Sequence, residues 1–155
     1  MQLDWENMFK RYIGNSTKTP YFVAVDKLTR VQANNEIFVF AVFQSVLLLL
    51  FAVVSLSDRM PHAGNPLVPF VTFALLGATA AYGASKHYMA AAAACVAPIA
   101  AGLYCAVFGF HPNLGSGDKI VLVTLLAVWA RYCWRILGIA RRYEEMAPGG
   151  PDKPR

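Results

Sequence analysis

The sequence predicts an all-α membrane protein with four transmembrane helices, and three observations support this. The chain has 155 residues, of which 57% are hydrophobic and 15% charged, so it is more apolar than a soluble domain of this size needs to be. Residues 37–56 form an uncharged run whose one strongly polar side chain is Gln44. As a helix this run spans about 30 Å, the thickness of the hydrocarbon core of a bilayer. Three further apolar runs follow, so we expect one domain built as a four-helix transmembrane bundle.

The first 36 residues predict a cytoplasmic interfacial segment made of amphipathic helices. Residues 1–14 place aromatic and aliphatic side chains at helical spacing, which indicates a short helix at the membrane surface. Thr19 followed by Pro20 is a helix-start signal, and we expect a second interfacial helix over about residues 20–34. No apolar segment with a cleavage site is expected at the N-terminus, so the first span itself would direct insertion.

The bundle is expected over residues 37–143, followed by a flexible proline- and glycine-rich tail over 144–155. Small residues are frequent in the second and third spans and favour close helix packing. Pro98 lies near the middle of the third span, where it removes one backbone hydrogen bond and predicts a kink. The four predicted spans cover about residues 37–56, 66–82, 89–110 and 120–139.

The distribution of basic residues predicts the orientation. Twelve of the fourteen lysine and arginine residues lie before the first span, in the second link or from Arg131 onward, whereas the other two links carry only Arg59 and Lys119. The positive-inside rule then places both termini in the cytoplasm. With no targeting peptide and with alanine-rich spans, we expect a multi-pass protein of the bacterial inner (cytoplasmic) membrane. This segregation accounts for the net charge of +5, so no nucleic-acid partner is expected.

No motif for an enzyme is visible in the sequence, and no acidic residue lies inside a predicted span. Ion-coupled pumps normally need intramembrane carboxylates, so proton or cation transport is disfavoured. His62 and His111 lie in the outer links and are only weak candidates for metal ligands, because few carboxylates are near them. An enzyme acting on a lipid would need these histidines or Asp118 at the outer face, where nothing else converges. We therefore expect no enzymatic activity and no cofactor.

The clearest candidate site surrounds Arg131, which lies about 16 Å below the outer boundary of the fourth span. From this depth its side chain reaches the cytoplasmic headgroups only with strain. Arg135 shares its helical face, and Gln44, Thr79 and the carbonyl of Ala94 are expected at a similar level. Two interpretations stay open. Tilt and local thinning bring Arg131 to the headgroups while Gln44 bonds a neighbouring helix, or the layer binds a lipid phosphate or another anion.

Glu36 lies at the cytoplasmic end of the first span and is the nearest candidate counter-charge for Arg131 or Arg135, in a structural or a functional ion pair. The favoured hypothesis is a non-enzymatic protein that acts through helix–helix contacts, either as an accessory or assembly subunit of a membrane complex or as a homo-oligomer. The alternative is a small carrier or channel for an anionic or lipid-like ligand, with Arg131 and Arg135 as cationic contacts. Expected partners are membrane lipids, anionic ones included, and other membrane subunits or a second copy.

Overall fold

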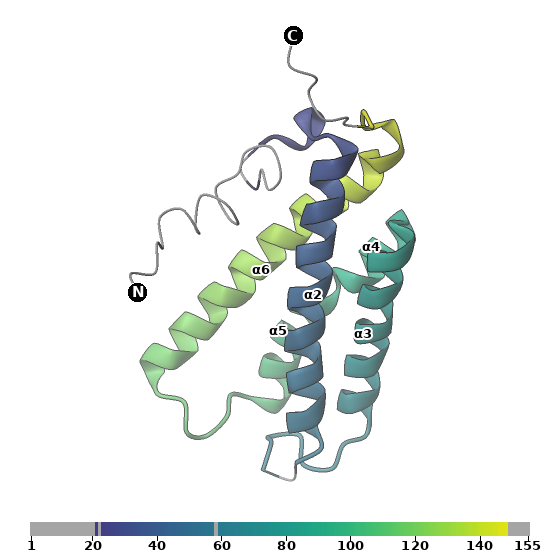
Figure 1. The fold of residues 1–155 in the computed structure, drawn as a ribbon. Coiled ribbons are helices and arrows are strands. Elements are labelled where there is room, and N and C mark those ends of the chain that lie inside the picture. The colour runs from purple at the N-terminus through teal and green to yellow at the C-terminus, as the bar shows by residue number, and fades with distance from the viewer. Residues whose placement is uncertain (1–20, 22, 58, 149–155) are drawn as a thin grey trace, which may run out of the picture.

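The computed structural model describes residues 21, 23–57 and 59–148, and this part of the chain is all-helical, as predicted (Figure 1). Four of its helical stretches are long and apolar enough to cross a membrane, namely Arg30–Ser55, Leu67–Ser85, Tyr88–Phe108 and Ser116–Glu145. The elements in chain order are η1 (Val25–Lys27), α2 (Arg30–Ser55), α3 (Leu67–Ser85), α4 (Tyr88–Ala94), α5 (Ala97–Phe108), α6 (Ser116–Arg142) and η2 (Tyr143–Glu145).

The start of α2 corrects the predicted interfacial helix over residues 20–34. In the described part of that range, the chain before Thr29 contains only the short 3-10 helix η1, and a continuous helix begins at Arg30. The Thr29 hydroxyl accepts a hydrogen bond from the backbone N–H of Gln32 (3.3 Å), and the Gln32 side chain accepts one from the N–H of Thr29 (3.0 Å). This capping box starts the helix there. The helix expected over residues 1–14 and the Thr19–Pro20 signal lie outside the described residues.

The third apolar stretch is broken rather than only kinked. Helix α4 ends at Ala94, and α5 begins at Ala97 after a turn at Cys95 and Val96. In an unbroken helix, the carbonyl of Ala94 would accept from the N–H of residue 98, but Pro98 has no N–H to donate. The proline therefore leaves one carbonyl in the interior free for a side chain.

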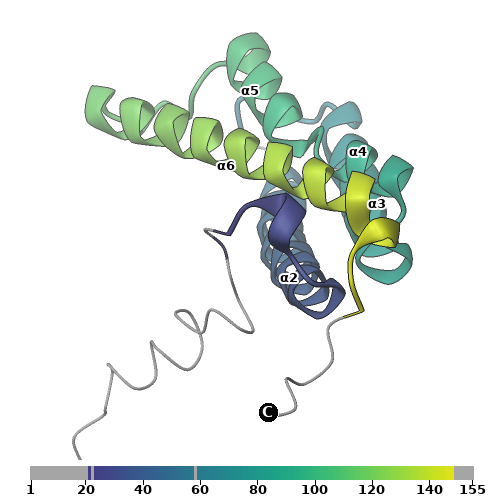
Figure 2. The ribbon, with the colours of Figure 1, turned by 90° about the horizontal axis from the view of Figure 1, so that it is seen from above.

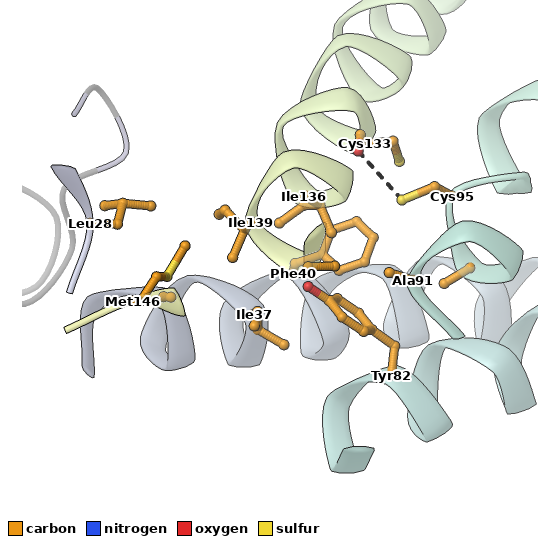
Figure 3. Packing of buried hydrophobic residues seen from close by; sticks show 13 residues of the cluster. Leu28, Ile37, Phe40, Tyr82, Ala91, Cys95, Cys133, Ile136, Ile139 and Met146 are labelled. Atoms are coloured by element: carbon orange, nitrogen blue, oxygen red, sulfur yellow. Dashed lines mark hydrogen bonds between the residues drawn. The ribbon is translucent and has the colours of Figure 1, made fainter. Parts of the chain in front are cut away.

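The hydrophobic core lies at one end of the bundle, where η1 and the start of α2 meet the C-terminal half of α6 (Figure 3). The rings of Phe40 and Tyr82 pack edge to face with their centroids 6.2 Å apart, and the thiol of Cys95 lies 3.5 Å from the carbonyl oxygen of Cys133. The most extensive contacts between helices join α3 to α2 and to α4. The buried core residues are Leu28, Ala33, Ile37, Phe40, Tyr82, Ala91, Ala94, Cys95, Cys133, Ile136, Ile139, Ala140 and Met146.

Helix α6 crosses the other helices obliquely, and its first half runs away from α2, α3 and α4 (Figures 1 and 2). Its buried residues all lie between Cys133 and Ala140. In the first half, large apolar side chains are open to the surroundings, such as Ile120 at 69% and Val128 at 61% of their surface. The helix is therefore packed over its C-terminal half and presents an apolar surface over its N-terminal half.

Candidate functional site

Gln44 is fully buried and connects four helices through its side-chain amide. Its Nε2 donates to the hydroxyl oxygen of Thr79 on α3 (2.8 Å) and to the carbonyl of Ala94 at the end of α4 (2.9 Å). Its Oε1 accepts from the indole Nε1 of Trp129 on α6 (3.2 Å). The structure thus brings Gln44, Thr79 and the carbonyl freed by Pro98 together at one level.

The orientation of this amide is fixed by its partners. A backbone carbonyl can only accept a hydrogen bond and an indole N–H can only donate, so the amide nitrogen must face Ala94 and its oxygen must face Trp129. The Thr79 hydroxyl donates its own hydrogen bond to the carbonyl of Leu75, one turn earlier on α3. Each polar atom in the layer thus has a partner, which is what a buried polar network requires.

Arg135 and Glu36 form a two-pronged ion pair between α6 and α2. The Nε of Arg135 lies 2.6 Å from Glu36 Oε1, and its Nη2 lies 3.0 Å from Oε2. The remaining Nη1 donates to the carbonyl of Val23 (2.7 Å), which holds the chain before η1 against α6. The side chain of Glu36 is 0% exposed and that of Arg135 15%. Partial burial and, secondarily, the Glu36 carboxylate raise the pKa of Tyr21 nearby.

Arg131 does not join either group. It is exposed on α6, one helical turn before Arg135, and it makes no hydrogen bond or ion pair to the residues that the structure describes. Glu36 therefore pairs with Arg135 alone of the two arginines. The predicted set of site residues separates into three parts: the Gln44–Thr79 layer, the Glu36–Arg135 pair, and Arg131 by itself.

His62 and His111 have separate surroundings at the opposite end of the bundle. The Nε2 of His62 lies 2.9 Å from the carbonyl of Ser55 at the end of α2, and its Nδ1 lies 2.9 Å from the hydroxyl of Tyr104 on α5. The carbonyl can only accept, so Nε2 carries the hydrogen. His111 accepts at Nδ1 from the N–H of Asn113 in its own link. Within residues 21, 23–57 and 59–148, no three His, Cys, Asp or Glu side chains gather in a metal-binding group.

We expect His62→Ala to loosen the link between α2 and α3, because both hydrogen bonds of the nearly buried ring are lost. Losing two such bonds should destabilise this end of the bundle by about 1–3 kcal/mol. Hydrogen exchange of residues 56–66 should then become faster. His111→Ala is the matched control, since that ring accepts one local bond. Equal exchange in the two variants would mean that His62 does not hold the link.

Two open clefts lie at the end of the bundle that holds the core. The larger, of about 640 Å³, runs between the start of α2 and the end of α3 and is lined by Asn34, Asn35, Phe38, Gly83, Ala84, Ser85, Lys86 and Tyr143. The smaller, of about 430 Å³, lies between η1 and the end of α6 and is lined by Val25, Asp26, Gly138, Arg141 and Arg142. Neither cleft is lined by a residue of the Gln44 layer or by Arg131.

Sequence reasoning missed two members of these networks. Trp129 is not among the predicted site residues, although its position two residues before Arg131 is a signal that it lies near the level of Gln44. The carbonyl of Val23 carried no sequence signal, because its position depends on how the chain before α2 folds back. Comparisons with protein-family models, with curated proteins and with solved structures found nothing that matches this chain.

Proposed function

We propose that this chain is a non-enzymatic, multi-pass protein of the bacterial inner membrane that acts through contacts between helices. It serves as an accessory or assembly subunit of a membrane complex or forms a homo-oligomer. The proposal draws on four helical stretches that are long and apolar enough to span a bilayer. We propose that both termini lie in the cytoplasm. This is supported by the described segments that carry several basic residues, before and at the start of α2 and at the end of α6, because they belong to the same end of the bundle (Figure 1).

The single observation that carries this proposal is the first half of α6. Helices in a membrane associate through packing and a few polar contacts, and a helix that leaves its own bundle offers its surface to a neighbour. The side chains of Val128 and Ile120 on this half are exposed, whereas the buried residues of α6 begin at Cys133. The side chain of Trp134, farther along α6, is also 74% exposed. Tryptophan is among the residue types that contribute most to binding at interfaces.

The interior supports a structural role for the polar residues. Gln44, Thr79 and Trp129 bond to one another and to a backbone carbonyl, and Arg135 is held by Glu36. The carrier hypothesis has less support, because the second of its two cationic contacts is already paired. A ligand at the Gln44 layer would have to replace these hydrogen bonds with bonds of its own.

Photo-crosslinking in the native membrane tests the proposal. A photoreactive amino acid is placed at Val128 on α6 or, as the matched control, at Phe70 on α3, which is 70% exposed. Helix α3 and the first half of α6 lie on opposite sides of α2 (Figure 1). We expect discrete protein adducts from Val128 and mainly lipid adducts from Phe70. Native mass spectrometry with retained lipids should then give a defined oligomer or complex. A monomer that forms no protein adduct at either position would overturn the proposal.

A further inference from the structure

One exposed stripe on α6 combines a charge with small and aromatic side chains. It consists of Ile120, Thr124, Ala127, Arg131 and Trp134, all exposed. Their offsets of 4, 7, 11 and 14 residues keep them on one side of a helix with 3.6 residues per turn. The stripe begins in the first half of α6, which has no buried residue, and ends at Trp134 within the packed half.

In the proposed membrane orientation, Arg131 lies deeper than a charged residue at the membrane surface would. It follows Trp129, whose indole reaches the buried Gln44 layer, by two residues, and it precedes Arg135 by one turn, or about 6 Å of helix. In the proposed orientation Arg131 therefore lies between the ion pair and the Gln44 layer, inside the hydrocarbon region. A cation at such depth is unfavourable unless a partner compensates it.

The direction of α6 disfavours a lipid phosphate as that partner. The helix runs from the outer side toward the cytoplasm, and side chains lean toward the N-terminus of their own helix. Arg131 therefore leans toward the centre of the bilayer and away from the cytoplasmic headgroups. To reach those headgroups, the Arg131 side chain would have to turn back toward the C-terminus of α6 and extend past at least one helical turn.

The described part of a second copy of this chain does not offer the missing charge either. Among the described residues, Glu36 is the only carboxylate that lies more than a turn inside an apolar helix, and it is fully buried against Arg135. The other described acidic residues lie before, at the start of or after the apolar helices, and they are Asp26, Asp118, Glu144 and Glu145.

We propose that the stripe of Ile120, Thr124, Ala127, Arg131 and Trp134 is a docking face for a transmembrane helix of a different protein, one that carries a carboxylate at the depth of Arg131. This inference rests on the proposed function and names the class of partner. The short side chains of Thr124 and Ala127 allow the partner's backbone to come close. The carboxylate gives Arg131 the charge-assisted pair that Arg135 already has with Glu36.

Binding of designed single-span helices tests this inference. The probe is a leucine-rich transmembrane peptide with one Glu at the matching depth, compared with the same peptide carrying Gln. Association with the full chain is measured by resonance energy transfer in phosphatidylcholine vesicles. A charge-assisted contact is worth about 1.5–3 kcal/mol, so we expect the Glu peptide to bind about tenfold or more tightly than the Gln peptide.

Arg131→Gln should remove this preference without unfolding the chain, because Arg131 holds no other described residue. Arg142→Gln is the matched control on the same helix and should keep the preference. Equal binding of the two peptides, or binding of neither, overturns the inference. So does a preference that anionic phosphatidylglycerol abolishes, since Arg131 would then pair with a lipid phosphate. Protein adducts at Val128 that persist without the Glu preference would overturn this inference and leave the proposed function standing.

Discussion

Replacing Arg135 with glutamine is expected to destabilise the chain by about 3–5 kcal/mol, the typical effect of removing one partner from a buried ion pair. The Glu36 carboxyl group is 0% exposed, and it would be left in the interior without the guanidinium that pairs with it. The backbone carbonyl of Val23 would also lose its donor, which frees the segment before η1. The stability of Arg135→Lys should fall between that of the unchanged chain and that of Arg135→Gln, because an ammonium keeps the charge but cannot form the two-pronged contact.

Thermal unfolding in mild detergent checks this expectation. The buried thiols of Cys95 and Cys133 become reactive when the core opens, so a thiol-reactive dye reports the midpoint. Arg142→Gln is the control, since Arg142 is exposed on the same helix. The double variant Glu36→Gln with Arg135→Gln should recover part of the loss, because neither charge is then left unpaired. A midpoint for Arg135→Gln that matches the control would show that the pair does not hold α2 to α6.

Gln44→Leu is expected to destabilise the chain by about 2 kcal/mol despite its similar size. The change leaves the indole N–H of Trp129 and the carbonyl of Ala94 without partners in the interior, and each buried unsatisfied group costs about 1–3 kcal/mol. Hydrogen bonds between helices in a membrane average nearer 0.6 kcal/mol, which keeps the expected total at the lower end.

Two threonine variants separate this network from a general effect of polarity. Thr79→Val removes the hydroxyl that accepts from Gln44 and should lower the unfolding midpoint, whereas Thr124→Val removes only a bond to the carbonyl of Ile120 within α6. In a background in which Trp5 and Trp134 are replaced by Phe, the emission of Trp129 should also shift in Gln44→Leu. Unchanged emission together with an unchanged midpoint would contradict the role assigned to Gln44.

The four apolar helices could be predicted because the signal is local. Length and composition decide whether residues 37–56 can span a bilayer, and no knowledge of neighbouring helices is needed. The common level of Gln44, Thr79 and Ala94 also follows from helix rise, together with the missing N–H of Pro98. The start of α2 was not predicted, because the Thr19–Pro20 signal was used and the capping box at Thr29 was overlooked.

The rest depends on how the helices rotate and tilt against one another. Arg131 and Arg135 differ by only about 40° around α6, yet one is exposed and the other is held by Glu36. Depth along a helix does not fix this rotation, so the sequence could not decide which arginine would find the carboxylate. The oblique path of α6 is likewise a property of packing over its C-terminal half, and no residue pattern in its first half indicates it.

The contacts at the packed end also set an order of assembly. Glu36 and Arg135 are 99 residues apart in the chain, and Arg30 donates to the carbonyl of Glu144, 114 residues away. At bacterial and eukaryotic synthesis rates of about 5–20 residues per second, Glu36 waits about 5–20 s for its arginine to be made. A nascent chain that stops before α6 therefore carries the Glu36 carboxylate without its partner arginine. The buried carboxylate of the first long helix is therefore paired only when the last helix is complete. In a truncated chain the unpaired Glu36 is a defect that cellular quality control can recognise.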